Sequence, residues 1–272
     1  MPYPADMDAR QDSYPWQVGL ASHPGRVRER NEDASLALHF VSVQQDEPPF
    51  PLGLFVLADG MGGHLQGQRA SALACQLAAG YVLQHILMPL LSEEGEESER
   101  APINEVLESA VSVAHEVVAR RLPDAGTTLT MALVLGSGVY IAHVGDSRAY
   151  LGKGGRLERL TQDHSMAARL QEMGQAAPEK LDSQRNILYR ALGQGPRIEP
   201  DIAYRGLEEG EYLLLCCDGL WGPVPDEEMT AIVNAAATPN AACQALVARA
   251  LEAGGEDNIS VIIAARGWPR CE

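Results

Sequence analysis

Basic residues are few in this chain compared with acidic ones. Its 272 residues include 21 lysines and arginines against 37 aspartates and glutamates, so the formal net charge is −16 at pH 7. A field of that sign repels nucleic acid and anionic lipid, and it attracts cations and basic partners. Solubility alone also accounts for such a charge. The balance therefore argues mildly against an enzyme that acts on nucleic acid.

Cysteine pairs and long apolar runs are also missing. The five cysteines are odd in number and include no C-x-x-C spacing, which predicts reduced thiols, mostly in the core, in a reducing compartment. Apolar runs are interrupted well before the roughly 20 residues that span a bilayer. The first ten residues carry acids and no apolar stretch, unlike a signal peptide. We therefore expect a cytoplasmic protein that does not bind a membrane.

The remaining composition is that of a globular chain, with 46% hydrophobic and 21% charged residues. A single domain of this length buries about 75% of the surface that its unfolded chain exposes. We predict a flexible N-terminal tail over residues 1–14 and one domain over 15–272. A polar stretch over 174–186 has weak periodicity and predicts a flap within that domain.

Apolar periodicity predicts strands and helices in an irregular order. Strands are predicted over 16–22, 34–43, 52–58, 128–135, 139–144, 148–152, 202–204, 212–217 and 259–264. Helices are predicted over 68–87, 104–121, 165–173, 226–236 and 241–253. Gly136-Ser137-Gly138 and Gly145-Asp146 are typical of hairpin turns. Because strands and helices do not alternate regularly, antiparallel sheets covered by helix pairs fit better than a doubly wound parallel sheet.

Five aspartates stand at the ends of predicted apolar strands, namely Asp33, Asp59, Asp146, Asp218 and Asp257. Each alone fits an ordinary turn or a solvated charge. Together they can converge in one cleft only if a cation offsets their repulsion, and hard divalent cations bind such oxygen ligands. Histidine and cysteine do not recur with zinc-like spacing, so Mg²⁺ or Mn²⁺ is favoured. Arg28 beside this set would supply a planar, two-pronged grip on phosphate oxygens.

The motifs occur in an order that identifies a family resemblance. R-x-x-x-E-D (28–33), D-G-M-G-G-H (59–64), G-T-T, G-D-S-R, T-x-D-H-S, D-G-L-W and D-N-I-S resemble those of the metal-dependent (PPM, type 2C) serine/threonine protein phosphatases. The similarity runs from about Val18 to Ala264, and the D-G-M-G-G-H form is like the bacterial branch. The resemblance implies an α+β fold, a four-layer α-β-β-α sandwich of two antiparallel sheets flanked by helix pairs.

The resemblance also implies a role for each acidic motif. Asp59 and the Gly60 carbonyl oxygen would ligate a pair of Mn²⁺ or Mg²⁺ ions, with Asp59 bridging them. Asp218 and Asp257 would complete the protein ligands of that pair. Asp146 matches the position that in bacterial relatives helps to hold a third, weaker metal.

Further residues would act around the metal pair. Asp33 is predicted as one of the metal ligands. Asp33 and Glu32 would lie at or just behind the site and hold metal-bound waters. Asn258 would support the site from behind. Arg28 would bind the substrate phosphate. The implied catalytic residues are Arg28, Asp59 and Asp218.

The implied reaction is hydrolysis of phosphoserine and phosphothreonine on proteins by a monomer that opposes a partner serine/threonine kinase. A hydroxide bridging two cations would attack phosphorus in line, while the cations and Arg28 stabilise the developing charge. A cysteine or serine nucleophile is not obvious, and the adjacent Cys216 and Cys217 are typical of buried strand thiols.

The sequence departs from the animal pattern at the proton donor. Animal relatives have a histidine two residues after the first metal aspartate, whereas this chain has Met61 there. His64, three positions further on, is a candidate general acid, with capping or packing of the following helix as the alternative role. A metal-bound water is as good a donor. His143 is interpreted as a core histidine, and His164 as part of a turn and helix cap.

Two other classes of function stay open at this point. A two-metal nuclease uses similar carboxylates but usually needs a basic track for the nucleic-acid backbone, which the net charge disfavours. A catalytically weak phosphoprotein-binding scaffold on the same fold is the stronger rival, although Arg28 and the metal aspartates are all in place. We predict that partner selectivity resides in the flap over 174–186.

Overall fold

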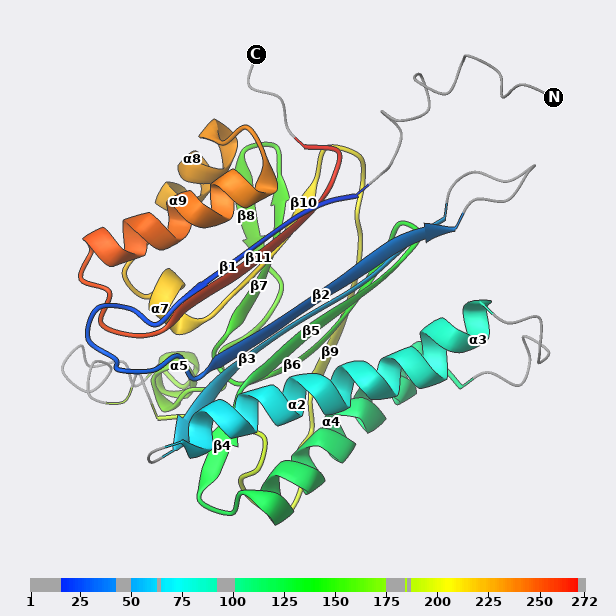
Figure 1. Ribbon diagram of the computed structural model, residues 1–272, viewed down its shortest axis with the longest axis vertical. Coiled ribbons are helices and arrows are strands. Elements are labelled where there is room, and N and C mark those ends of the chain that lie inside the picture. The colour runs from blue at the N-terminus through cyan, green and yellow to red at the C-terminus, as the bar shows by residue number, and fades with distance from the viewer. Residues whose placement is uncertain are drawn as a thin grey trace.

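The computed structural model describes residues 16–42, 50–62, 65–91, 101–174, 184 and 187–268. The predicted tail lies outside these ranges, as does the predicted flap except for Gly174 and Gln184. The described strands form two antiparallel sheets stacked face to face, and helices cover the outer face of each (Figure 1). The predicted four-layer α-β-β-α sandwich is therefore confirmed.

The first sheet joins strands from both ends of the chain. Its order is β1 (Trp16–His23), β11 (Ile259–Arg266), β10 (Tyr212–Cys216), β7 (Arg148–Lys153) and β8 (Arg156–Arg159). Strands β10 and β11 are buried on both faces, because helices cover one side and the second sheet covers the other. This explains why their sequences are continuous apolar runs and do not alternate with polar residues.

The second sheet contains the longest described strand. Its order is β2 (Asp33–Ser42), β3 (Phe50–Gly62), β5 (Leu129–Leu135), β6 (Gly138–Val144) and β9 (Asp201–Gly206), and β4 (Ala125–Thr127) pairs with the end of β3. Strands β5 and β6 form the hairpin predicted around Gly136 and Gly138.

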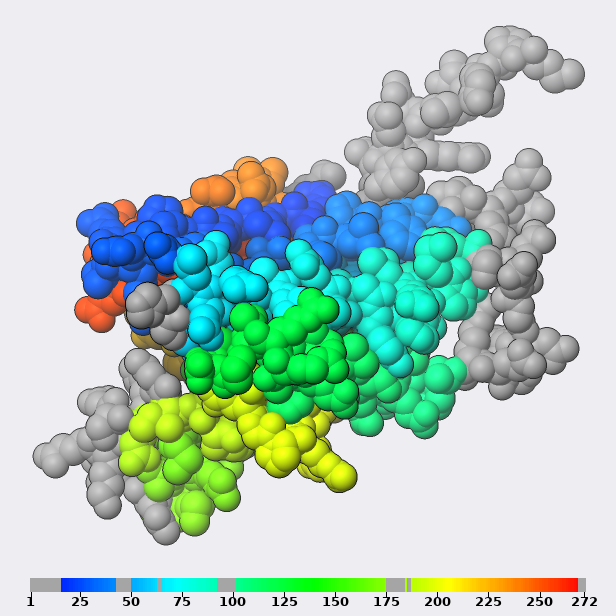
Figure 2. All heavy atoms as spheres, turned by 60° about the horizontal axis from the view of Figure 1, so that its bottom comes forward, coloured from blue at the N-terminus to red at the C-terminus, as the bar shows by residue number. Residues whose placement is uncertain are grey.

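Helices cover the sheets in two groups. The second sheet carries α2 (Gln66–Val82), which continues through the π-helical turn η2 (Leu83–Leu87) into α3 (Met88–Leu91), and α4 (Ile103–Arg121). The first sheet carries α7 (Asp218–Trp221), α8 (Asp226–Ala235) and α9 (Pro239–Glu252), and α5 (Met166–Glu172) lies apart from both groups. In the space-filling view, α2 and α4 (cyan to green) lie side by side, and the yellow-green chain near α5 forms a separate lobe (Figure 2).

Buried apolar side chains among the described residues fall into three clusters, one in each interface between layers. One lies between α2, α4 and the second sheet, one between the two sheets, and one between the first sheet and α8 and α9. Ala70, Ala74 and Ala78 are fully buried on α2. Alanine at these positions favours the helix and lets it approach the sheet closely.

One helical stretch, Gln66–Leu91, is long and apolar enough to cross a membrane by length and composition. This stretch differs from the prediction that apolar runs are too short to span a bilayer. The buried apolar residues of α2 pack against β3 and α4, whereas Met88, Leu90 and Leu91 at the end of the stretch are exposed. Arg69 and Gln76 lie on the exposed side of α2.

Two boundaries predicted from the sequence were wrong. Gly145-Asp146 does not make a hairpin, because β6 and β7 belong to different sheets and the chain crosses between the sheets there. Strand β3 does not end at Ala58 but continues to Gly62, since Gly60 pairs with Thr127 of β4. The short elements β4, β8 and α7 were not predicted, because fewer than five residues carry too little periodicity.

Candidate metal centre

A cleft of about 210 Å³ opens at one end of the sandwich, where ends of strands from both sheets meet. The second sheet contributes the start of β2, the end of β3 and the turn after β6. The first sheet contributes the residues after β10 and before β11. The cleft is lined by Arg28, Glu32, Asp59, Gly60, Met61, Gly62, Thr128, Asp146, Leu188, Asp218, Asp257 and Asn258. The structure thus brings together most of the residues that the motifs predicted for the site.

Asp59 is held by its backbone in the middle of this cleft. Its N–H donates to Thr128 Oγ1 at 2.8 Å, and its carbonyl oxygen accepts from Thr127 Oγ1 at 2.9 Å. Asp33 stands directly opposite Asp59 in the β2–β3 ladder, so two carboxylates are neighbours across strands. Gly60 is required next to them, because a Cβ there would clash with the Gly67 carbonyl at the start of α2.

The two threonines of the G-T-T motif are functional residues that the sequence analysis did not assign. Thr127 and Thr128 fix the backbone of Asp59, which is more than sixty residues away in the chain. The motif itself was the available signal, but a hydroxyl that bonds to a distant backbone leaves no periodic trace in the sequence.

Asn258 holds the loop over 24–32 through its side-chain amide, and its backbone N–H donates to Asp257 Oδ1 at 2.8 Å. Its Oδ1 accepts from the Glu32 N–H at 2.7 Å, and its Nδ2 donates to the carbonyls of Pro24 at 2.9 Å and Arg30 at 2.8 Å. These three bonds tie the loop to the start of β11. The loop that carries Arg28 and Glu32 is therefore positioned by the residue next to Asp257.

Arg28 is the one basic residue among the described residues that line the cleft. Its Nη2 lies 2.8 Å from Asp257 Oδ2, and its side chain is 54% exposed. The hydrogen bond and the charge of Asp257 raise the pKa of Arg28, so it stays protonated. Burial raises the pKa of Glu32, against the opposing charge of Arg28. A half-exposed guanidinium at an acidic cleft is free to contact an anion that enters.

Asp146 lies in the crossing between β6 and β7. Gly145 has φ +111° and packs against Thr128, so a side chain there would clash. The hydroxyls of Ser147 and Thr128 lie 2.8 Å apart, and Trp221 Nε1 donates to the Asp146 carbonyl at 3.0 Å. The turn is thus held from both sheets, and its carboxylate lies in the cleft beside Asp218.

The carboxylates are buried and repel one another. Burial, followed by the charges of neighbouring aspartates, raises the pKa of Asp59 and Asp146 well above the ordinary value. The same causes raise the pKa of Asp218, and burial raises the pKa of Asp33 to about 7. Both Oδ atoms of Asp33 and Oδ1 of Asp218 are buried with no hydrogen-bond partner. Such groups are costly unless a cation or a donor satisfies them.

The donor set therefore fits hard divalent cations, which bind carboxylate and carbonyl oxygens. Among the described residues, no group of three or more histidine, cysteine or acidic side chains is already drawn together closely enough to hold an ion. The observations that favour a metal are the buried carboxylate oxygens without hydrogen-bond partners and the raised pKa values of these aspartates. A preformed arrangement of ligands is not one of these observations.

The proton donor predicted at His64 lies outside the described residues. Met61 lines the cleft, and Gln194 Nε2 contacts its sulfur at 3.7 Å. Cys216 and Cys217 are fully buried, and burial raises the pKa of both thiols, so the prediction of buried thiols is confirmed, although Cys217 lies just after β10 at the start of α7. Cys75 and Cys243 are also free and buried.

A second group of polar residues, all buried except the partly buried Arg148, lies behind Asp146, and we call it the bonded cluster. Its members are Thr130, His143, Ser147, Arg148, Asp163 and His164. His143 bonds through Nδ1 to Thr130 Oγ1 at 3.0 Å and through Nε2 to two carbonyls, so its interpretation as a core histidine is confirmed. Burial lowers the pKa of His143 to about 4.

His164 makes hydrogen bonds with both the N–H and the carbonyl group of Gly145. The His164 N–H donates to the Gly145 carbonyl at 2.7 Å, and the Gly145 N–H donates to His164 Nδ1 at 3.1 Å. Because Nδ1 accepts, the ring proton is on Nε2, which lies 3.1 Å from Asp201 Oδ2. The helix cap predicted here is made by Ser165, whose Oγ accepts from the Ala168 N–H.

Comparison with known proteins identifies relatives along most of the chain. The family model described as protein phosphatase 2C matches residues 63–259. The serine/threonine phosphatase stp of Listeria monocytogenes is 36% identical over 244 residues, which cover 89% of this chain and 92% of that protein. The serine/threonine protein phosphatase PstP of Mycobacterium tuberculosis is 34% identical over 253 residues, which cover 89% of this chain and 43% of that protein.

Solved structures agree with the fold. The serine/threonine phosphatase of S. agalactiae has a TM-score of 0.75 at 28% identity, covering 92% of this chain and 99% of that one. The catalytic domain of PstP, solved in complex with two manganese ions, has a TM-score of 0.71 at 30% identity, covering 92% and 97%. This chain therefore belongs to the protein phosphatase 2C family and is a metal-dependent protein serine/threonine phosphatase of the bacterial type.

Proposed function

We propose that this chain hydrolyses phosphoserine and phosphothreonine esters of proteins in the cleft formed by the ends of both sheets. The observation that carries the proposal is the set of carboxylates that line this cleft beside one half-exposed arginine, together with the buried, unpartnered oxygens of Asp218 in the cleft and of Asp33 next to Asp59. An excess of buried negative charge fits divalent cations, and the arginine fits a phosphate.

We assign the metal-holding residues as follows. Asp59, the Gly60 carbonyl, Asp218 and Asp257 would hold two ions, Mn²⁺ or Mg²⁺, and Asp33 with Glu32 would stand behind them. Asp146 would help to hold a third, weaker ion. When bound, such ions supply a nucleophile from water near neutral pH and offset the charge of the phosphoryl group. The manganese ions in the PstP structure support this assignment.

The protein residues contribute binding and orientation. Arg28 would contact two phosphoryl oxygens through its planar guanidinium, and Asp257 holds it at the cleft at 2.8 Å. The described residues that line the cleft include no cysteine, serine or histidine, which favours direct attack by water over a covalent intermediate. The Thr128 hydroxyl is already engaged with Asp59 and Ser147. The leaving alkoxide would take its proton from water or from His64.

The wider setting is also part of the proposal. Phosphorylated proteins are the substrates of this enzyme class, and we propose a serine/threonine kinase as the opposing partner, a monomeric state and a cytoplasmic location. The four described cysteines are free and buried, which is compatible with a reducing compartment. The net charge of −16 favours basic segments of partners and disfavours nucleic acid.

Hydrolysis of p-nitrophenyl phosphate and of a phosphothreonine peptide tests the proposal. Each substrate is measured with Mn²⁺, with Mg²⁺ and with EDTA, beside the variant Asp218→Asn. We expect turnover that EDTA and the substitution both abolish. A folded protein that hydrolyses neither substrate with either metal would instead support the alternative, a phosphoprotein-binding scaffold, which capture of a phosphothreonine peptide would then detect.

A further inference from the structure

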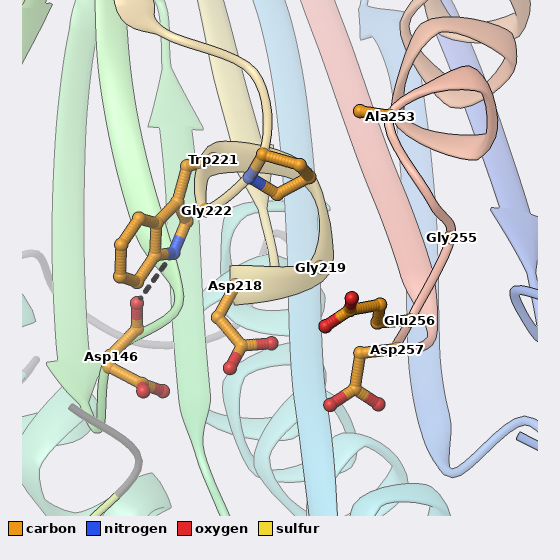
Figure 3. Close-up of a pocket in the computed structure, with 10 residues that line it drawn as sticks. Asp146, Asp218, Gly219, Trp221, Gly222, Ala253, Gly255, Glu256 and Asp257 are labelled. Atoms are coloured by element: carbon orange, nitrogen blue, oxygen red, sulfur yellow. Dashed lines mark hydrogen bonds between the residues drawn. The ribbon is translucent and has the colours of Figure 1, made fainter. Parts of the chain in front are cut away.

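A second cavity, of about 340 Å³, adjoins the cleft on the side of α7. The two cavities share three carboxylates, those of Asp146, Asp218 and Asp257. The second cavity extends from them between α7 and the connection from α9 to β11 (Figure 3). Its other lining residues are Gly219, Trp221, Gly222, Pro223, Ala253, Gly255 and Glu256. A peptide held by its phosphate in the cleft would reach this cavity with a neighbouring side chain.

The aromatic wall of the cavity is fixed in place before any ligand enters. Trp221 donates from Nε1 to the Asp146 carbonyl at 3.0 Å. The Arg148 guanidinium stacks 3.4 Å from the centre of the Trp221 ring, and Asp163 holds that guanidinium by bonds of 3.0 and 2.7 Å. A wall that is already ordered loses little entropy when it binds a side chain. Pro223 adds an apolar surface beside it.

The opposite side of the cavity presents an unpaired carboxylate. Figure 3 shows Glu256 across the cavity from Trp221, close to the level of Asp218. Glu256 is exposed, and among the described residues it makes no ion pair within 4.0 Å. Arg26 bonds to the neighbouring Gly255 through its backbone N–H and does not pair with Glu256. Basic side chains do not occur among the lining residues of this cavity.

We propose that this cavity receives the side chain of a substrate residue that flanks the phosphorylated one, and that it selects lysine or arginine there. The aliphatic stem would lie along Trp221 and Pro223, and the cationic head would meet Glu256. In an extended peptide, residues two apart point to the same side and lie about 7 Å from each other. The neighbour two positions from the phosphoresidue therefore points to the same side as the phosphate, and we expect it to enter the adjoining cavity, which shares three lining residues with the cleft. This inference rests on the proposed phosphatase function.

Charge explains why the selected side chain is basic. An acidic neighbour would meet the like charge of Glu256, which is not among the proposed metal-holding residues, whereas a cationic neighbour would be paired with it. The net charge of −16 acts in the same direction at long range. A flat apolar neighbour would bury the Trp221 surface but leave Glu256 without a partner.

Matched phosphothreonine peptides test the inference with the full chain and Mn²⁺. The peptides differ only in arginine, glutamine or glutamate two positions before or after the phosphothreonine. We expect wild-type kcat/KM to be about fivefold higher for arginine than for glutamine, the scale of one partly exposed ion pair. Glu256→Gln should remove the difference, and Glu256→Lys should reverse the preference toward glutamate.

Glu252→Gln is the matched control, because Glu252 is exposed at the end of α9 and does not line the cavity. It should keep the wild-type preference. Equal rates for all peptides, or a preference for arginine that survives Glu256→Lys, would overturn the inference. Hydrolysis of p-nitrophenyl phosphate, which has no flanking residue, separates the two failures. If it proceeds while the peptides are not distinguished, only the side-chain subsite is wrong. If neither substrate is hydrolysed, the proposed function fails as well.

Discussion

Two groups of buried and partly buried polar residues adjoin in this molecule and differ in how completely they are hydrogen-bonded. In the bonded cluster, every member has a partner at hydrogen-bond distance, as Arg148 has in Asp163 and His164 has in Gly145. In the carboxylate centre, which comprises Asp33, Asp59, Asp146, Asp218 and Asp257, buried oxygens of Asp33 and Asp218 have none. The two groups meet at the Asp146-Ser147 peptide.

This difference distinguishes the residues that hold the backbone in place from the residues that bind the reacting groups. A satisfied buried network stabilises one arrangement of the backbone, and here it fixes the turn on which Asp146 stands. An unsatisfied group stores unfavourable free energy that a bound cation can release. The fold thus places a rigid, complete cluster behind an incomplete one, and the incomplete one is where chemistry occurs.

Replacing one aspartate of each group by asparagine should change the stability of the metal-free protein in opposite directions. Asp59→Asn removes a repelled, buried charge, so the EDTA-treated protein should unfold at a higher temperature than wild type. Asp163→Asn breaks a buried ion pair with Arg148 and should lower the free energy of unfolding by about 3–5 kcal/mol. Asp59→Asn should also reduce kcat/KM with Mn²⁺ by at least about 10³-fold.

Thermal unfolding in EDTA and initial rates with Mn²⁺ measure both effects. If Asp59→Asn lowers the unfolding temperature as much as Asp163→Asn does, the carboxylate centre is not a repulsive site and the comparison fails.

The free energy of unfolding should change with pH in opposite directions in the presence and in the absence of metal. The folded-state pKa of Asp33 is raised from 3.8 to about 7, and those of Asp59, Asp146 and Asp218 are raised too. In EDTA, a raised carboxyl pKa contributes stability below pH 4, and this contribution is lost as pH rises through about 7. The shift at Asp33 alone corresponds to about 4 kcal/mol at most.

With Mn²⁺, the dependence should reverse, because ions bind the deprotonated carboxylates and stabilise the folded state more as pH rises. Unfolding temperatures between pH 4 and 8, with and without EDTA, measure this. Asp33→Asn serves as the control and should flatten the curve in EDTA. Parallel curves with and without metal would argue that these carboxylates do not hold the ion.

The sequence predicted the layers and the meeting of the aspartates better than the connections between them. Long periodic segments such as α4 and β11 start and end within two residues of their predicted bounds. The turn at Gly145 was misread as a hairpin, because a glycine followed by an aspartate looks the same whether the chain returns within one sheet or crosses to the other.

The supporting contacts could not be predicted for a related reason. Thr128 bonds to Asp59, and Trp221 to the carbonyl of Asp146, across 69 and 75 residues of sequence. Such pairs depend on the three-dimensional register of strands from different parts of the chain. Local propensity contains no information on that register. The resemblance to a known family placed the ligands, and the structure adds what positions them.

Within the bonded cluster, His164→Asn should have a moderate effect. Asparagine cannot keep both the Nδ1 bond to the Gly145 N–H and the Nε2 bond to Asp201. Losing one buried partner should lower the free energy of unfolding by about 1–3 kcal/mol, or roughly 2–4 °C per kcal/mol for a protein of this size.

Because His164 positions the turn before Asp146, the Mn²⁺ concentration that gives half-maximal rate should rise in this variant. Metal titrations at constant substrate check this effect, with Glu252→Gln as the control. A variant that loses stability but keeps the wild-type Mn²⁺ requirement would show that the bonded cluster supports the fold alone.

The smallest effect on stability is expected for Arg28→Lys, at the exposed rim of the carboxylate centre. Arg28 is half-exposed and its bond to Asp257 is at the surface, so thermal unfolding should change little. Lysine keeps the charge but loses the planar pair of donors, so kcat/KM for phosphopeptides should fall about tenfold, or 1.4 kcal/mol in transition-state binding. Arg249→Lys, at a surface ion pair with Glu228 distant from the cleft, is the control and should retain full activity. If Arg28→Lys keeps the wild-type kcat/KM, then only the positive charge at this position matters for phosphate binding. Recognition of the phosphate geometry would then come from the ions bound to the carboxylate centre.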